Sequence, residues 1–165
     1  MKPALLVIDV QKAFFEGSPF KIQSLNQAIE YINYTINFFR QMNLPIISIQ
    51  HMDEEDGLMP GTEGFDLPEG LDILETDIHI NKKYGNAFNK TRLLEELNTL
   101  GVDTVFISGY RAENCVLSTC RGAEDLDLMP IIIRGSIASD SLEMIQFVEK
   151  INELISIDAL EKMLE

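Results

Sequence analysis

The run Ala4-Leu5-Leu6-Val7-Ile8-Asp9-Val10 has the composition of a strand that is buried on both faces of a sheet. It is short, nearly continuously apolar and rich in branched side chains, as expected for a strand with helices packed on either side. Four further runs of this kind are present at Pro45 to Gln50, Asp77 to Ile80, Thr104 to Ser108 and Pro130 to Ile133, and a weaker one at Leu154 to Ile157. The sequence therefore predicts a sheet of five or six strands.

Longer amphipathic segments separate these runs. Apolar residues recur at helical spacing in the first two segments, at Leu25, Ile29, Ile32, Ile36 and Phe39 and then at Leu93, Leu94, Leu97 and Leu100. Gly101 directly follows the second helix and predicts its C-terminal cap. A third helix is expected to begin near Asn114 or Cys115, and a fourth after Asp140, whose side chain can cap it while Glu143 reaches back. This alternation is typical of an α/β fold with a parallel sheet.

Between the second and third predicted strands, Met52 to Asp72 is rich in glycine and proline and predicts a long irregular loop. Loops of this length in compact domains are usually functional. No repeat, linker or shift in composition divides the chain, and its 165 residues suit one ordinary domain. We therefore expect a single domain over residues 1–165.

The chain is strongly acidic, with 13 Lys and Arg residues against 27 Asp and Glu residues and a formal net charge of −14. Such a field repels phosphate backbones and anionic lipid surfaces, so neither nucleic acid nor a membrane is an expected partner. No apolar run approaches the roughly 20 residues of a transmembrane helix. Asp9 interrupts the first apolar run and no small-residue cleavage pattern follows, so we expect no signal peptide and a cytoplasmic location.

Three chemically active side chains lie where predicted strands end: Asp9 at the tip of the first, Lys82 after the third and Cys115 beyond the fourth. Ligands of open parallel sheets bind outside the carboxyl ends of the strands, so these residues would share one rim. Taken singly, each also fits a structural role, as a cap, a solvated charge or a small buried hydrophobe. Together they supply a thiol, a carboxylate that can take its proton and a cation that can hold the anion, which favours catalysis.

Cys115 is predicted at the start of a helix, seven residues beyond Ser108. At that place a thiolate gains from the helix dipole and free backbone N–H groups can receive an oxyanion, a geometry that suits acyl transfer. Cys120 lies five residues further along, on a different helix face. The two thiols are therefore expected to stay unpaired.

Three ordered motifs resemble those of the isochorismatase-like cysteine hydrolase family: Asp9-Val10-Gln11-x-x-Phe14, Lys82-x-x-x-Asn86-Ala87-Phe88 and Gly109-x-x-Ala112-Glu113-x-Cys115-Val116. The resemblance covers nearly the whole chain and implies a Rossmann-like three-layer α/β/α fold. It also implies a catalytic triad in which Cys115 attacks a carbonyl carbon, Asp9 acts as base and Lys82 stabilises charge. The spacing to the Asn-Ala-Phe segment selects Lys82 rather than Lys83.

The same resemblance implies a cis peptide between Tyr110 and Arg111, and an oxyanion hole formed by the backbone N–H groups of Arg111 and Cys115. The sequence departs from the commonest family pattern at Ala13, Asn86 and Ala112, where Asp, Ser and Thr are frequent. Arg134-Gly135-Ser136 stands where many members have an aspartate near the end of the fifth strand. That departure leaves the polarity of the pocket open.

The side chains expected to bind substrate are Gln11, Phe14, His51, Tyr84, Phe88 and Tyr110, although aromatic residues at such places are often core. His51 sits where metal-binding nicotinamidases of this family begin an Asp-x-His ligand set, but His79 is predicted inside a strand, away from it. Catalytic zinc normally takes three protein ligands with histidine prominent, so no metal and no other cofactor is expected. The acidic run after His51 is interpreted as a solvated loop.

The expected function is hydrolysis of a small, uncharged or monoanionic amide, or a related C–N substrate, through a thioester at Cys115. One alternative is isochorismatase-type vinyl ether hydrolysis, which is associated with family members that lack the nucleophilic cysteine. The other is a catalytically silent binding module. Because the family is usually oligomeric, a homo-oligomer, at least a dimer, is expected.

Overall fold

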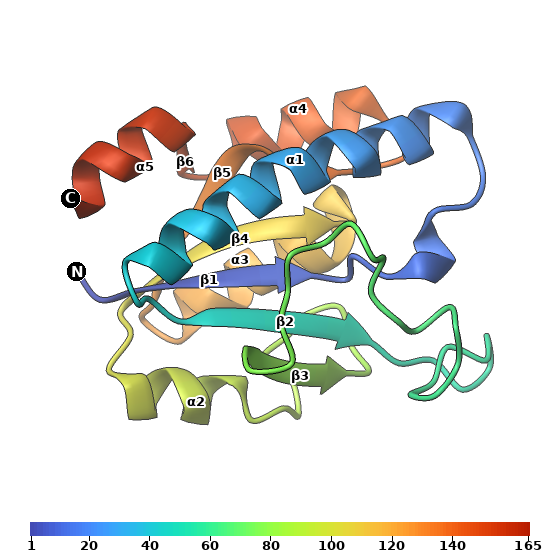
Figure 1. Cartoon of the computed structure of the whole chain (residues 1–165), viewed down its shortest axis with the longest axis horizontal. Coiled ribbons are helices and arrows are strands. Elements are labelled where there is room, and N and C mark those ends of the chain that lie inside the picture. Colours follow the sequence, from blue (N-terminus) through green and yellow to red (C-terminus); the bar gives the residue numbers. More distant parts are fainter.

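The computed structural model describes residues 1–165 and is built around a six-stranded parallel sheet (Figure 1). Its strands are β1 (Pro3–Ile8), β2 (Ile46–His51), β3 (Ile78–Lys82), β4 (Thr104–Tyr110), β5 (Met129–Ala138) and β6 (Leu154–Ile155). They are ordered β3-β2-β1-β4-β5-β6 across the sheet. The predicted Rossmann-like α/β sheet is confirmed, and the strand order reverses between β1 and β4, where ligands of such folds bind.

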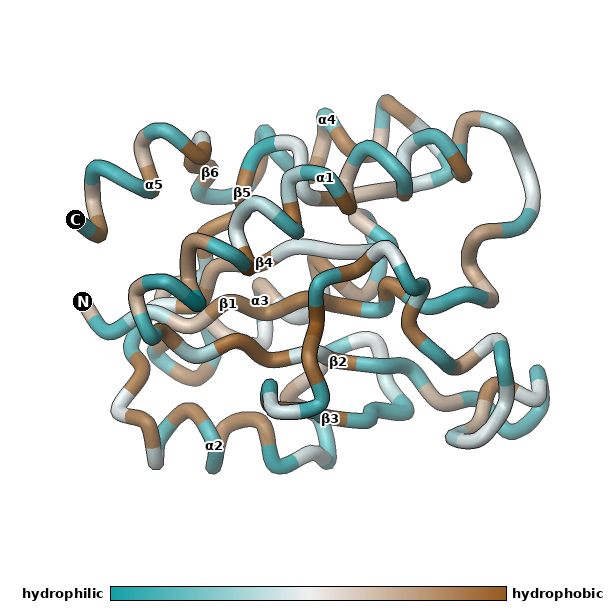
Figure 2. Tube along the Cα trace, viewed as in Figure 1, coloured by the Kyte–Doolittle hydropathy of each residue, from teal (hydrophilic) through white to brown (hydrophobic).

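Helices cover both faces of the sheet and bury a separate apolar core against each (Figure 1). One face carries α1 (Pro19–Gln41) and α5 (Ile157–Leu164), and the other carries α2 (Leu93–Leu100), α3 (Leu117–Asp125) and α4 (Leu142–Lys150). Figure 2 shows the hydrophobic residues gathered along β1, the strand between these two cores. None of the helices combines the length and the apolar composition that a bilayer-spanning segment needs.

Local signals in the sequence explain where most helices begin and end. Ser18 caps α1 by accepting a hydrogen bond from the Lys21 amide, and Gly101 ends α2 in the left-handed conformation, with φ 67°. The fourth helix differs from the prediction, because its cap is Ser141 rather than Asp140. The C-terminal helix α5 was not predicted, although Ser156 caps it in the same way.

The fifth strand is longer than predicted, since β5 continues past Ile133 to Ala138. Its polar middle contains Gly135 at φ 85°, where a Cβ atom would approach the ring of Tyr31 to 2.7 Å. Glycine therefore lets the strand pass beneath α1 and run on toward the carboxyl edge of the sheet. The third strand also ends later than predicted, at Lys82 rather than Ile80, so that Lys82 is its last residue instead of following it.

The connection from β2 to β3 forms no helix, as predicted for the glycine- and proline-rich segment. It is tied to the carboxyl edge of the sheet through the Phe65 carbonyl, which accepts hydrogen bonds from Gln11 Nε2 (3.1 Å) and Gln50 Nε2 (2.9 Å). Gln11 Nε2 also donates to the His51 carbonyl at 3.0 Å, and its Oε1 accepts from the His51 amide at 2.7 Å. Gln11 thus fastens the loop and the end of β2 to β1.

Candidate active site

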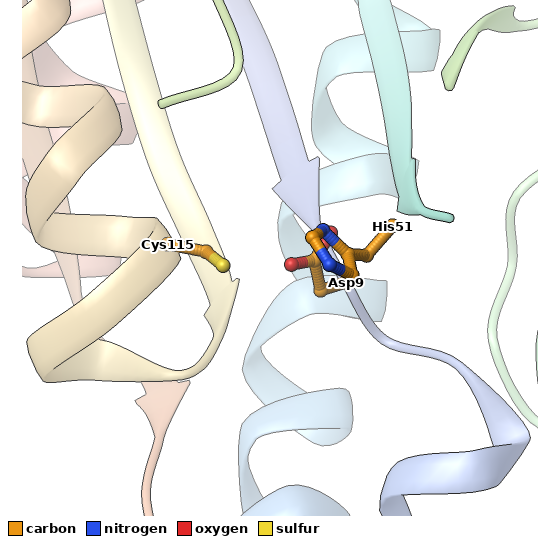
Figure 3. Close-up of side chains that lie close together, drawn as sticks. All are labelled: Asp9, His51 and Cys115. Atoms are coloured by element: carbon orange, nitrogen blue, oxygen red, sulfur yellow. The ribbon is translucent and has the colours of Figure 1, made fainter. Parts of the chain in front are cut away.

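Four side chains meet at the carboxyl edge of the sheet, and Lys82 lies among the other three. Its ammonium nitrogen lies 2.9 Å from Asp9 Oδ2, 3.0 Å from His51 Nδ1 and 3.3 Å from Cys115 Sγ. Figure 3 shows the Cys115 sulfur directed toward Asp9 and His51. Because an ammonium group has three hydrogens, these three contacts use its full donor capacity.

The backbone around the strand ends explains why these side chains converge. Asp9 directly follows β1 and has φ 52°, which turns the chain at the end of the strand. Gly109 in β4 has φ 118°, and a Cβ atom there would collide with the Ile8 carbonyl oxygen. After β4, a short π-helical turn at Ala112–Val116 carries Cys115 toward Asp9. The helical segment therefore begins earlier than predicted, with the thiol inside its first turns.

Burial controls the protonation of this cluster. It raises the pKa of Asp9, whose carboxylate is only 2% exposed, and the charge and hydrogen bond of Lys82 oppose the shift. Burial and the neighbouring charge of Asp9 raise the pKa of Cys115 to about 11. The resting thiol is therefore protonated at neutral pH, and the expected thiolate stabilised by the helix dipole is not what this environment favours. Asp9 Oδ1 is buried without a hydrogen-bond partner, which leaves it free to accept the thiol proton.

The cluster opens into a cavity of about 400 Å³. Phe14 and Tyr110, whose ring centroids are 5.1 Å apart, form an aromatic part of its wall, and His51 lines it as expected. Asp53 and Asp56 also line it, so two members of the acidic run interpreted as a solvated loop face the site. A bridge between Asp53 and Leu58 folds this part of the loop back toward the cavity, a contact that local sequence does not reveal.

Three of the side chains expected to bind substrate do not line this cavity. Gln11 is fully buried and holds backbone groups, as described above. Tyr84 is 42% exposed, and the Lys90 ammonium lies 5.2 Å from its ring centroid. Phe88 packs against the apolar core beneath α2 and α3. The motif positions are as expected, but the strands and turns that carry these residues direct their side chains elsewhere.

The peptide bond between Tyr110 and Arg111 is cis, in the position that the family resemblance implied. Both side chains contact Asp140: the Tyr110 hydroxyl donates to Oδ1 at 2.9 Å, and Arg111 Nη2 lies 3.2 Å from Oδ2. Arg111 Nε lies 2.9 Å from Glu113 Oε1 as well. Asp140 therefore supplies a carboxylate just beyond the end of β5, whereas Arg134-Gly135-Ser136 within the strand stands where many family members have an aspartate. The Arg111 side chain is already paired with two carboxylates.

The donor set does not fit a metal ion. Asp9, His51 and Cys115 each offer a ligand atom, and these atoms lie within 4.8 Å of one another. The Lys82 ammonium, however, hydrogen-bonds to all three residues. A metal ion bound by the same atoms would lie next to this positive charge and be repelled by it. The second histidine, His79, places Nε2 2.9 Å from the Leu74 carbonyl oxygen, outside the cluster.

Both free cysteines are unpaired, as predicted, but only Cys115 touches this cluster. A larger depression of about 620 Å³ lies at the amino edge of the sheet, beside Met1, Asp103 and Met129. It is lined by no cysteine, serine, lysine or histidine. The chemistry of the molecule is therefore concentrated at the carboxyl edge.

The Isochorismatase domain family model matches residues 3–152. The isochorismatase family protein YddQ of Bacillus subtilis is 26% identical over 147 residues, which cover 87% of this chain and 82% of the relative. An isochorismatase-like hydrolase from Alkaliphilus metalliredigens superposes with a TM-score of 0.90 over 100% of both chains, at 24% identity. N-carbamoylsarcosine amidase from Thermoplasma acidophilum superposes with a TM-score of 0.79 over 94% of this chain and 95% of its own, at 22% identity. Since the family model spans nearly the whole fold and the site built on it, the chain belongs to the isochorismatase family of hydrolases.

Proposed function

We propose that the protein is a cysteine hydrolase that cleaves the C–N bond of a small amide or related substrate through a thioester at Cys115. The observation that carries this proposal is the pair of contacts made by Lys82 Nζ, 2.9 Å to Asp9 Oδ2 and 3.3 Å to Cys115 Sγ. They hold the nucleophile and the base each within hydrogen-bond reach of the cation, and a carboxylate oxygen of Asp9 lies within 4.8 Å of the Cys115 sulfur, the arrangement that activates a weakly acidic thiol.

In the first half of the reaction, Asp9 Oδ1 takes the thiol proton while the Cys115 sulfur attacks the carbonyl carbon. The displaced electron pair moves to the carbonyl oxygen, which the backbone N–H groups of Arg111 and Cys115 stabilise. As the C–N bond breaks, Asp9 returns the proton to the departing nitrogen. Lys82 keeps its positive charge beside the sulfur and the carboxylate throughout.

In the second half, a water molecule attacks the thioester carbon while Asp9 takes one of its protons. The C–S bond then breaks, the carboxylic acid leaves, and the proton held by Asp9 returns to the Cys115 sulfur. The same carboxylate thus serves as base and then as acid in both halves. A buried base with a raised pKa suits this double role, because it holds a proton more readily than a solvated aspartate does.

The cavity favours neutral substrates over dicarboxylates. Its cationic side chain, Arg111, is neutralised by Glu113 and Asp140, while Asp53 and Asp56 add negative charge to the wall. The net charge of −14 also lowers the local concentration of anions. An amide needs only the thiol, a base and an oxyanion hole, and one relative of similar fold is an amidase.

A panel of small primary amides and ureido compounds, followed by release of ammonia, tests this function. We expect at least one to be hydrolysed, with no loss of rate after treatment with a metal chelator. Isochorismate is included in the panel to test the alternative function, vinyl ether hydrolysis. Turnover of isochorismate above that of every amide would overturn the proposal, as would loss of activity on chelation with recovery on adding zinc. No turnover of any compound would favour the catalytically silent binding module.

A further inference from the structure

His51 is the last residue of β2, and in the sheet register it pairs with Lys82 of β3. Paired residues on neighbouring strands project their side chains to the same face, which places the imidazole ring beside the ammonium group. The ring lines the catalytic cavity, and one of its nitrogens lies within 4.8 Å of the Cys115 sulfur. His51 is therefore close enough to touch a substrate bound at the sulfur.

The contact with Lys82 determines which ring nitrogen carries the proton. An ammonium group can only donate, so His51 Nδ1, 3.0 Å away, must accept. Burial and the Lys82 charge lower the pKa of His51, against weaker opposite effects of Asp9 and Asp53, so the ring is neutral at pH 7. The single ring proton then sits on Nε2. That nitrogen makes no hydrogen bond within the protein, so it presents a free donor to the cavity.

We infer that His51 donates a hydrogen bond from Nε2 to a substrate oxygen beside the scissile carbonyl, so that the site selects amides carrying a second oxygen acceptor one or two bonds from the reacting carbon. This inference rests on the proposed function and names its substrate class. Two donors near the ring are engaged within the protein: the Tyr110 hydroxyl donates to Asp140 Oδ1, and Arg111 Nη2 donates to Asp140 Oδ2. A simple alkyl amide would leave the His51 N–H without a partner once the cavity is closed to water, which disfavours its binding.

Two substitutions of His51 test the roles of its two ring nitrogens one at a time. His51→Asn keeps an acceptor close to the position of Nδ1, facing Lys82, and removes the donor at Nε2. His51→Gln keeps a donor close to the position of Nε2 and removes the acceptor for Lys82. His79→Asn is the matched control, since the other histidine of the chain is bound to the Leu74 carbonyl outside the site.

The first readout needs no known substrate. Cys115 is alkylated with iodoacetamide, which has a carbonyl oxygen beside its reacting carbon, and with allyl iodide, which lacks it; labelling is followed by peptide mass spectrometry. We expect His51→Asn to slow iodoacetamide about tenfold while allyl iodide changes by less than about twofold, the loss of one hydrogen bond. His51→Gln should keep the ratio of the two rates and slow both reagents. His79→Asn should change neither.

The second readout is the ratio of kcat/KM for pyruvamide and isobutyramide, which have the same size and shape but differ in that a ketone oxygen of pyruvamide takes the place of one methyl group. Wild type should favour pyruvamide, in part because its ketone makes the amide carbonyl more electrophilic, and His51→Asn should lower that preference about tenfold. Equal slowing of both alkylating reagents by His51→Asn, or no change in either, would overturn the inference. Failure of the proposed function is a separate result: amide turnover that survives Cys115→Ala, whatever the variants of His51 do.

Discussion

Cys115 and Cys120 lie five residues apart in one helical segment, yet their surroundings differ. Cys120 is 1% exposed within the apolar core, whereas Cys115 lines the cavity and contacts Lys82. Burial raises the pKa of both thiols, to about 11 for Cys115 and about 12 for Cys120. The pKa values of the two thiols in the free protein therefore differ little. What separates them is a carboxylate that can take the proton, a cation that can hold the anion and space for a substrate.

The largest effect is expected from replacing each cysteine by alanine, one at a time. Cys115→Ala should lower amide turnover by at least about a thousandfold, because the covalent route is lost. Cys120→Ala should stay within about threefold of wild type and slightly lower the melting temperature, because it leaves a small cavity in the core. Ammonia release and thermal unfolding measure both. Equal loss of activity in the two variants would contradict the claim that Cys115, and not Cys120, is the nucleophile.

The next effect concerns the base. Asp9→Asn should reduce kcat by about a hundredfold to ten-thousandfold, the usual contribution of a general base. Because burial raises the pKa of Asp9, wild-type activity should fall on acidification at a higher pH than the ordinary 3.8 of an aspartate, as the base becomes protonated. The variant should lack this acid limb in a pH profile of kcat/KM. An acid limb that is unchanged in Asp9→Asn would assign it to another group.

Asp9→Asn should also change the acidity of one thiol and not of the other. The charge of Asp9 raises the pKa of Cys115, so its removal should shift the alkylation midpoint of Cys115 below about 11 and leave that of Cys120 unchanged. Rates of iodoacetamide labelling against pH, resolved by peptide, give both midpoints. A shift of the Cys115 midpoint to higher pH would contradict the assigned cause.

A smaller but still large effect is expected at the cation. Lys82 is fully buried against Asp9, whereas Lys83 is 59% exposed and lies 3.6 Å from Glu54 at the surface. Lys82→Met should lower activity about a hundredfold or more and also lower the melting temperature, because a buried carboxylate loses its partner. Lys83→Met should change both little. If Lys82→Met does not fold, labelling of Cys115 in Lys82→Arg, which keeps the charge, decides its role; the reverse ranking of the two lysines would refute it.

The smallest expected effect tests a residue that holds the site without lining it. Gln11→Ala removes three hydrogen bonds to the backbone at His51 and Phe65. The free energy of unfolding should fall by about 2 to 3 kcal/mol, because buried backbone groups lose their partners. Gln27→Ala, at an exposed position of α1, is the control. Chemical denaturation measures both; equal stability of the two variants would mean that water replaces the lost contacts.

The sequence predicted the parallel sheet and the three strand-end residues because both depend on local pattern. Apolar runs specify buried strands, and residues at their carboxyl ends share an edge in any fold of this kind. The length of β5, by contrast, depends on Gly135 fitting beneath Tyr31, a residue of α1 far away in sequence. The loss of Tyr84 and Phe88 from the expected pocket, and the gain of Asp53 and Asp56, also follow from tertiary contacts that no local pattern encodes.

The protonation of Cys115 could not be predicted from its position either. A helix start favours a thiolate, but burial and the Asp9 charge act more strongly in the opposite direction. Only the three-dimensional placement of Asp9 shows this effect on the thiol. In the proposed reaction, Cys115 is therefore activated during the attack rather than before it.

The most direct test of the central claim is to trap the covalent intermediate. The enzyme is mixed with its best amide substrate, quenched in acid within the first turnovers, digested and mapped by mass spectrometry. We predict the mass of the substrate's acyl group on the peptide at Cys115, removed by hydroxylamine as a thioester should be, with Cys120 unmodified. Steady turnover without any adduct at Cys115, together with activity that persists in Cys115→Ala, would contradict the account.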